Sequence, residues 1–163
     1  LDVRLGFYRG FDEFKVSRWT SDGRELARLM SAVRCLAGRT QIAKTLRYAG
    51  EQRRESRIDA VVFVGDCCEE DVDAVGHEAA QLGLLGLPVF VFQEGDDRTA
   101  SRLFPQIAKL TRGAYCRFDR SSPDQLKRLL GAVAAYAAGG RSALLKYGKD
   151  QGGAAALLTN QMK

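Results

Sequence analysis

The residues of this 163-residue chain that could do chemistry are carboxylates placed just after apolar runs. Asp66 follows the apolar run at 60–64 with one glycine between them, and further acids follow the apolar run at 89–92. Such runs are typical of buried parallel strands, whose carboxyl ends form the ligand-binding edge of α/β sheets. Carboxylate oxygens on loops suit Mg²⁺, Mn²⁺ or Ca²⁺ better than zinc. We therefore expect a cation site or a basic-partner site at this edge. The other acids of the two loops are Glu69, Glu70, Asp71, Glu94, Asp96 and Asp97.

The distribution of charge marks the same part of the chain. The net charge is +5, yet residues 58–97 contain ten Asp and Glu and no Lys or Arg. The flanking residues, 1–57 and 98–163, carry net charges of +6 and +9. An acidic block inside a basic chain indicates a local site for a cation or a basic partner, with chance and solubility as the alternative. Glu69 and Glu70 fit solvated charges or contacts to a basic partner, and the acids of the second loop fit solvated loop positions.

The sequence contains few residues that could carry out nucleophilic catalysis. The single histidine, His77, falls within an expected helix, so neither a Ser-His-Asp nor a Cys-His arrangement is expected. Neither a Walker A loop nor a Gly-x-Gly-x-x-Gly loop occurs. A carboxylate at a strand end can also act as a nucleophile, so the alternative function is a metal-dependent phosphoryl-transfer or hydrolytic enzyme that uses Asp66.

The four cysteines do not match a metal-binding motif. Cys67 and Cys68 are adjacent, and they cannot easily share one ion with the distant Cys35 and Cys116. A low cysteine count is typical of reduced thiols in a cytoplasm. Most of these cysteines are expected to be small buried apolar residues.

The apolar periodicity predicts alternating strands and helices. The strand at 14–19 carries polar residues among apolar ones, which is typical of an exposed edge strand paired antiparallel. Asp22 and Glu25 predict a capping box, Thr40 is expected to cap the second helix, and Pro105 is expected to interrupt or kink the fourth. The expected strands lie at 3–9, 14–19, 60–64, 89–92 and 114–118, and the expected helices at 22–38, 41–57, 71–85, 98–111 and 122–140.

This alternation predicts an α/β fold, a doubly wound and mostly parallel sheet with one antiparallel edge strand and helices on both faces. Residues 1–140 are expected to form this domain, and residues 141–163 a helical tail that packs on it or extends from it. No apolar run is long enough to cross a membrane, and the N-terminus lacks signal-peptide character. We expect a cytoplasmic protein with no membrane partner.

Two segments resemble the von Willebrand factor A family. Residues 38–46 read Gly-Arg-Thr-Gln-Ile-Ala-Lys-Thr-Leu, which matches the Gly-x-Thr-x-Ile-x-x-x-Leu opening of a helix in that family, and Asp66 ends a later apolar strand. The resemblance covers residues 3–138. It implies a metal-ion-dependent adhesion site in which Thr40 and Asp66 bind Mg²⁺, or alternatively Mn²⁺ or Ca²⁺. It also implies a protein partner whose carboxylate completes the coordination, within a larger intracellular assembly.

Two departures from the family pattern reduce the number of metal ligands that the chain can supply. The Asp-x-Ser-x-Ser motif that ends the family's first strand is absent, and Gly65-Asp66-Cys67 stands in place of Thr-Asp-Gly. The chain is therefore expected to begin at the family's second strand, as an N-terminally incomplete domain. Thr40 and Asp66 alone leave most of the coordination to water, which predicts weak affinity. A missing central strand would also expose strand edges and favour pairing with another chain, including a homodimer.

Four arginines lie on the expected second helix, in which Tyr48 is the one aromatic residue, so aromatic residues do not alternate with them. A solvated helix face therefore fits better than a phosphate-binding patch, and nucleic acid is not the expected partner. A basic nucleic-acid-associated module stays as a third hypothesis. Trp19, on the expected edge strand, fits either the rim of the core or an interaction anchor. The four arginines are Arg47, Arg53, Arg54 and Arg57.

Overall fold

The structure is a computed structural model that describes residues 1–33, 38–119, 121–151 and 153–162. Its centre is a parallel sheet of three strands in the order β3-β4-β5, namely β3 (Val61–Gly65), β4 (Val89–Glu94) and β5 (Ala114–Phe118). The middle strand is buried along its whole length up to Gln93, as its continuous apolar sequence predicts. The predicted α/β fold with parallel strands is confirmed.

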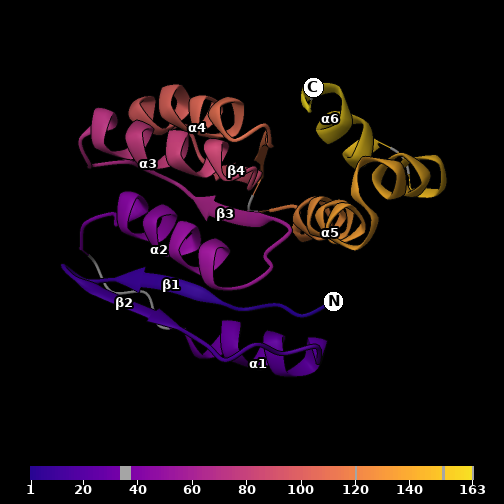
Figure 1. Ribbon diagram of the computed structural model, residues 1–163, viewed down its shortest axis with the longest axis horizontal. Coiled ribbons are helices and arrows are strands. Elements are labelled where there is room, and N and C mark those ends of the chain that lie inside the picture. Colours follow the sequence, from indigo (N-terminus) through magenta and orange to yellow (C-terminus); the bar gives the residue numbers. More distant parts are fainter. Residues whose placement is uncertain (34–37, 120, 152, 163) are drawn as a thin grey trace.

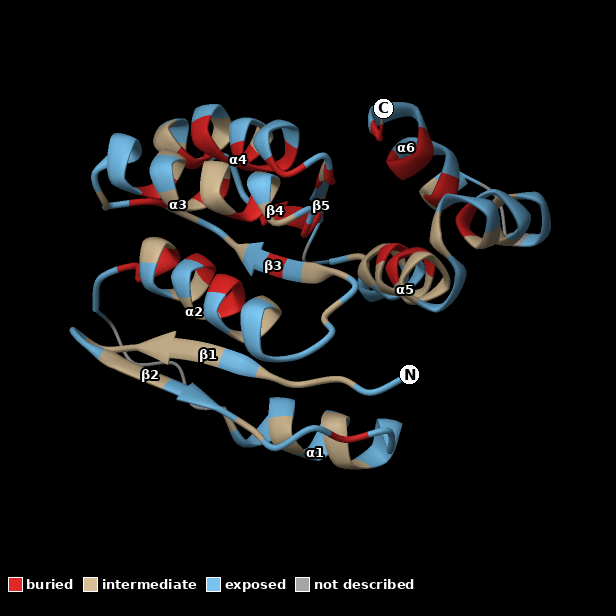
Figure 2. Ribbon diagram, in the orientation of Figure 1, coloured by how far each residue is buried: buried red, intermediate tan, exposed pale blue. Residues whose placement is uncertain are grey.

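Three helices cover one face of this sheet (Figure 1). They are α2 (Ile42–Glu55), α3 (Val72–Leu84) and α4 (Arg98–Leu110). Their buried residues form one core cluster with the side chains of β3 and β4 that point to the same side. In Figure 2 these buried residues (red) gather on the inner sides of the helices. At the centre of this core the rings of Phe63 and Phe104 pack edge to face, with their centroids 5.4 Å apart.

Two C-terminal helices cover the opposite face over β4 and β5. They are α5 (Pro123–Gln151) and α6 (Gly153–Gln161). The backbone leaves the helical conformation at Gly139 and Gly140, the point where the sequence predicts a helix end. The side-chain amide of Gln161 accepts a hydrogen bond from the Tyr115 N–H at 2.9 Å and donates one to its C=O at 2.9 Å, which fixes α6 against β5. The fold therefore has three layers, helices–sheet–helices.

The N-terminal part forms a separate antiparallel sheet of two strands, β1 (Gly6–Arg9) and β2 (Glu13–Val16), followed by α1 (Gly23–Ala32). The predicted antiparallel strand is thus present, and β1 is its partner. Helix α2 holds this hairpin against the rest of the chain. The Arg4 guanidinium, for example, donates hydrogen bonds to Tyr48 and Gln52 of α2 at 2.9 and 2.8 Å.

In two helices the structure differs from the predictions for the capping box and for the proline. Asp22 caps α1 by accepting from the Arg24 N–H, but Glu25 bonds to Arg18 and Thr20 and so does not complete the predicted capping box. The predicted continuation of this helix, with Cys35 and Leu36, lies outside the described residues. Helix α4 continues through Pro105 without ending there.

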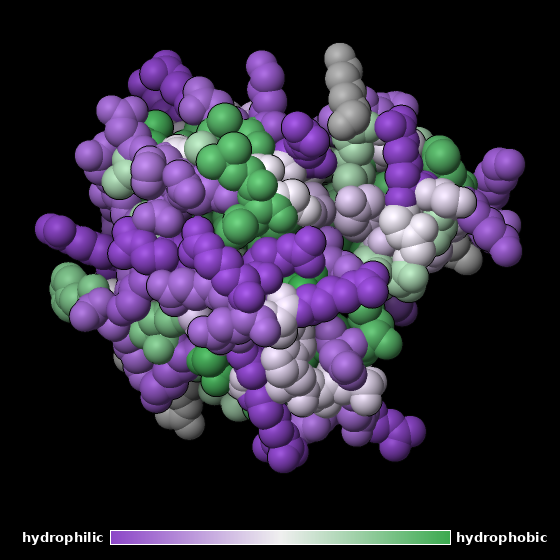
Figure 3. Space-filling model, in the orientation of Figure 1, coloured by the Kyte–Doolittle hydropathy of each residue, from purple (hydrophilic) through white to green (hydrophobic). Residues whose placement is uncertain are grey.

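The surface of the described chain is mainly hydrophilic on the side shown in Figure 3, with scattered apolar patches. No helix among the described residues is both long and apolar enough to cross a membrane. The core clusters on the two faces of the sheet account for the large apolar side chains that are fully buried.

Candidate functional site

The candidate site lies at the carboxyl end of β3, where two loops meet. One loop, residues 66–71, follows β3 and leads into α3, and the other, residues 38–41, leads into α2. The buried hydroxyl of Thr40 accepts a hydrogen bond from the Glu69 N–H at 3.1 Å. This bond joins residues that are 29 apart in the sequence and ties the two loops together. The predicted role of Thr40 as the cap of the second helix is wrong, because its hydroxyl serves the other loop.

Glu70 supplies the cap that α2 needs. Its carboxylate accepts hydrogen bonds from the N–H groups of Ile42 and Ala43, the latter at 3.0 Å, whereas Gln41 makes no side-chain capping bond. A carboxylate at a helix N-terminus satisfies unpaired N–H groups and interacts favourably with the helix dipole. The interpretation of Glu70 as a solvated charge or a partner contact is therefore wrong, since this side chain is used inside the molecule.

Asp66 and Cys67 form the exposed part of the site. The Asp66 side chain is exposed, and the Cys67 thiol donates a hydrogen bond to its carboxylate. Partial burial, this hydrogen bond and the negative charges of Asp66, Glu69 and Asp97 raise the pKa of Cys67 to about 11. Asp97 lies in the loop after β4, so the structure brings acids of both predicted loops near one thiol.

Tyr8 of β1 is a member of the site that the sequence does not reveal. Burial raises the pKa of its hydroxyl, and the charges of Glu70, Cys67, Asp66 and Cys68 raise it further. These interactions place β1 beside the loop that follows β3. Tyr8 alternates with Phe7 and Arg9 along a short strand, and nothing in that pattern indicates which strand or loop lies next to it.

The described residues do not form a complete metal site. No group of three or more His, Cys, Asp or Glu side chains among them is arranged to hold one metal ion. Thr40 and Asp66 lie at the same edge of the sheet, but no hydrogen bond joins their side chains. A divalent cation held here would take most of its ligands from water or from another molecule.

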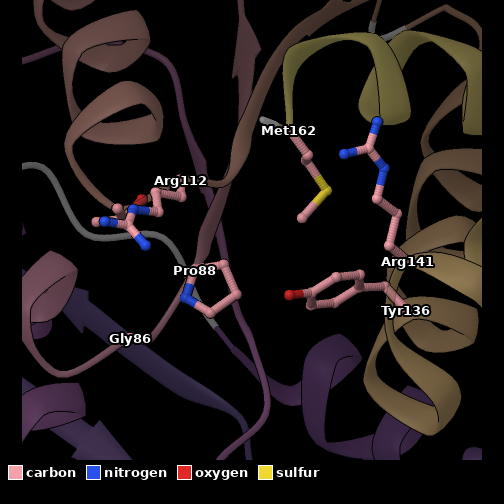
Figure 4. A pocket seen from close by; sticks show the side chains of 7 residues that line it. Gly86, Pro88, Arg112, Tyr136, Arg141 and Met162 are labelled. Carbon is pink, nitrogen blue, oxygen red and sulfur yellow. The ribbon is translucent and has the colours of Figure 1, made fainter.

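Two cavities lie at other places. One, of about 540 Å³, opens at the carboxyl ends of β4 and β5. The other, of about 280 Å³, lies at the amino edge of the sheet. There the Tyr136 side chain of α5 points toward Pro88, and the Arg141 side chain points away from it (Figure 4). The first is lined by Glu94, Gly95, Arg117, Phe118, Asp119 and Gln125, and the second by Gly86, Pro88, Thr111, Arg112, Tyr136, Arg141 and Met162.

The basic face of α2 is largely occupied by contacts within the chain. Arg47 forms an ion pair with Glu78 of α3 at 2.7 Å. Arg53 donates a hydrogen bond to the Ile58 C=O at 2.7 Å, and Arg57, just after the helix, pairs with Asp59 at 3.0 Å. Three of the four arginines named above therefore have partners within the chain.

Trp19 and His77 both lie on the surface of the molecule. The Arg4 guanidinium lies 4.7 Å from the centroid of the Trp19 ring, and Trp19 is exposed. His77 is exposed on α3.

The raised pKa of Cys67 predicts slow alkylation. At about pH 8, a thiol with a pKa near 11 has about 100-fold less thiolate than one with the ordinary value of 9.0, and the thiolate is the reactive form. We expect iodoacetamide to modify Cys67 about 100-fold more slowly in the folded chain than in the denatured chain, as measured by mass spectrometry. Asp66→Asn should speed this reaction, because it removes a negative charge next to the thiol.

Asp96→Asn is the control for this measurement, since Asp96 is an exposed acid of the neighbouring loop and is not among the acids that raise the Cys67 pKa. Equal alkylation rates for Asp66→Asn and Asp96→Asn would contradict the contact between Asp66 and Cys67.

Comparison with known proteins gives no matching family model, no matching curated protein and no matching solved structure.

Proposed function

We propose that the chain is a protein-interaction module of the von Willebrand factor A type, acting in the cytoplasm, whose binding surface is the carboxyl edge of β3. The observation that supports this most is the hydrogen bond from the Glu69 N–H to Thr40, because it joins the two loops that carry Thr40 and Asp66. In the family that the sequence resembles, these positions are the second and third elements of the adhesion site.

The charges around Asp66 support the same surface. Asp66, Glu69 and Asp97 all lie near enough to Cys67 to raise its pKa, so negative charge gathers at this edge. An edge of this kind attracts a divalent cation or a basic group.

The cation in this proposal is Mg²⁺, or alternatively Mn²⁺ or Ca²⁺. The described residues do not fit a self-sufficient metal site, so Thr40 and Asp66 would supply a minority of the ligands. Water and the carboxylate of a protein partner would supply the others. Cation binding by the chain alone should consequently be weak, and binding of partner and cation should depend on each other.

Calorimetric titration of the full chain with Mn²⁺ or Mg²⁺ tests this proposal. We expect weak binding that acetate, as a substitute for the partner's carboxylate, strengthens. Asp66→Ala should remove the binding heat, because it removes the exposed carboxylate of the site.

Asp96→Ala is the matched control, because it removes an equal charge from an exposed position of the next loop. Binding that is absent from the wild-type chain, with and without acetate, would reject the cation. Equal loss in the two variants would reject the specific role of Asp66.

A further inference from the structure

The C-terminal ends of α3 and α4 touch each other and expose two leucines. A Cβ atom on Gly83 would collide with the Leu110 C=O group, so the two helices are in contact at this point. Leu84, which follows Gly83, is 82% exposed, and Leu110 is 44% exposed. In Figure 3 one of the apolar patches (green) lies over α3 and α4. Exposed apolar side chains that come from neighbouring positions, rather than singly, indicate a contact surface.

The charges next to these leucines are positive. Residues 79–93 contain no charged residue, and residues 98–118 contain five Lys and Arg but no Asp or Glu. Two of these cations, Lys109 and Arg112, are close to Leu110 in the chain, and both are exposed. Neither side chain forms an ion pair or a hydrogen bond with the residues that the structure describes. Most basic residues of α2, in contrast, have partners within the chain.

Arg112 occupies a backbone position that favours glycine. Helices α3 and α4 end with the same hydrogen bond, in which an N–H just past the helix donates to a C=O five residues earlier. The residue before this N–H has a positive φ in both, +63° for Gly86 after α3 and +58° for Arg112 after α4. Glycine is usual there, because a Cβ atom strains this conformation. The fold accepts that strain and keeps a guanidinium group beside the exposed leucines.

The cavity of about 280 Å³ at the amino edge of the sheet adjoins the same surface, because Arg112 also lines it. Pro88, Tyr136 and Met162 contribute apolar groups to its wall. In Figure 4, Arg112 and Arg141 lie on opposite sides of the cavity. Two cations placed in this way suit carboxylates on either side of an apolar residue better than they suit one small anion.

Apolar groups with cations around them resemble a protein-binding surface, in which apolar anchors lie at the centre and charges at the rim. An acidic protein segment with apolar residues would use the leucines, the cavity and the cations together. A nucleic-acid backbone would use the cations alone, and a basic segment would be repelled by them. The observations therefore favour an acidic protein segment as the partner.

We propose that this surface binds a partner protein through a segment in which apolar residues are flanked by Asp and Glu. The apolar side chains contact Leu84 and Leu110 and enter the cavity, while the carboxylates pair with Lys109, Arg112 and Arg141. This inference goes beyond the function proposed for the carboxyl edge of β3. It concerns the opposite edge of the sheet, and it does not require a cation.

The probe for this proposal is the fluorescently labelled peptide acetyl-Asp-Glu-Leu-Phe-Glu-Asp-Leu-Phe-Asp-Glu-amide, with binding to the full chain followed by fluorescence anisotropy in EDTA. We expect saturable binding that NaCl weakens, because exposed charges are screened by salt. A neutral peptide with Asn and Gln in place of the acids should bind about tenfold more weakly. A peptide with Ala in place of Leu and Phe should lose a similar factor.

Leu84→Glu should weaken binding of the acidic peptide about tenfold or more, since it places a negative charge on the proposed contact. Leu84 is exposed, so the core stays intact in this variant. Val72→Glu is the matched control, because Val72 is 40% exposed at the other end of the same helix. Its binding should equal that of the wild-type chain.

Arg112→Gly separates the charge of this residue from its place in the fold. Glycine suits the positive φ, so the variant should be at least as stable as the wild-type chain in urea, yet it should bind the acidic peptide about threefold more weakly. Lys127→Ala is the control for net charge, because Lys127 is an exposed cation near the start of α5. It should bind as the wild-type chain does.

Four results would overturn the proposal. They are no binding of the acidic peptide, equal binding of the neutral peptide, equal effects of Leu84→Glu and Val72→Glu, and equal effects of Arg112→Gly and Lys127→Ala. Binding of a DNA duplex that Arg112→Gly weakens, with no peptide binding, would assign the cations to phosphate groups instead. Because the measurements are made in EDTA, failure of the cation titration leaves this test intact.

Discussion

Replacing Phe104 with alanine is expected to lower the free energy of unfolding by about 3–5 kcal/mol. Phe104 is fully buried, and its ring packs edge to face against Phe63 at a centroid distance of 5.4 Å. The substitution removes this contact and leaves a cavity between α4 and the sheet. Because a domain of this size is stable by about 5–15 kcal/mol, one substitution would remove a large part of its stability.

Urea denaturation followed by circular dichroism measures this change. Phe11→Ala is the matched control, because Phe11 is 81% exposed and its replacement should change the free energy of unfolding by less than about 0.5 kcal/mol. A loss below about 1 kcal/mol for Phe104→Ala would contradict the packing of α4 on the sheet.

The same ring lies behind the candidate site. A Cβ atom placed on Gly65 would come within 2.8 Å of the Phe63 ring and 3.3 Å of the Phe104 ring. The two rings therefore pack against the backbone of the residue just before Asp66. The loss of Phe104 is expected to loosen the end of β3 as well as the core. The position of Asp66 therefore depends on a side chain that has no reactive or metal-binding group.

The parallel strands could be predicted from the sequence, but only part of the helix packing could. The run at 89–92 is apolar at every position, and only a strand buried on both faces needs such a sequence. On α4, Leu103 and Ile107 are buried as their spacing predicts, whereas Leu110 is 44% exposed and Phe104 takes a central place. The apolar stripe of a helix is broad, and its spacing does not show where the sheet ends beneath it.

The candidate site could be located from the sequence more easily than its contacts. Asp66 follows an apolar run, and acids that follow such runs lie at the carboxyl edge of a parallel sheet. The hydrogen bond of Thr40 to Glu69 and the effect of Glu70 on Tyr8 connect segments far apart in the chain. No local pattern encodes such contacts, because they exist only after the loops and the hairpin have been placed by the packing of α2.

Replacing Glu70 with alanine is expected to lower the free energy of unfolding by about 1–3 kcal/mol. The Glu70 carboxylate accepts from the N–H groups of Ile42 and Ala43, and without it these two groups at the start of α2 lose their partner. Ile42 is fully buried, so water cannot replace the carboxylate at no cost. Urea denaturation gives the change, and Glu70→Gln should fall between the wild-type chain and Glu70→Ala, since the amide keeps one acceptor oxygen.

Glu69→Ala is the control that separates the cap from the charge. Glu69 is the exposed neighbour in the same loop, and its contact with Thr40 uses the backbone N–H, which alanine keeps. Removing its charge should therefore change stability by less than about 0.5 kcal/mol. If Glu69→Ala and Glu70→Ala were equally stable, the cap would contribute nothing. If only Glu70→Ala loses stability, the loop after β3 is held at the start of α2 by two contacts, one through Thr40 and one through Glu70. A cation or partner that binds at Asp66 would then bind to a loop whose position the fold has already fixed.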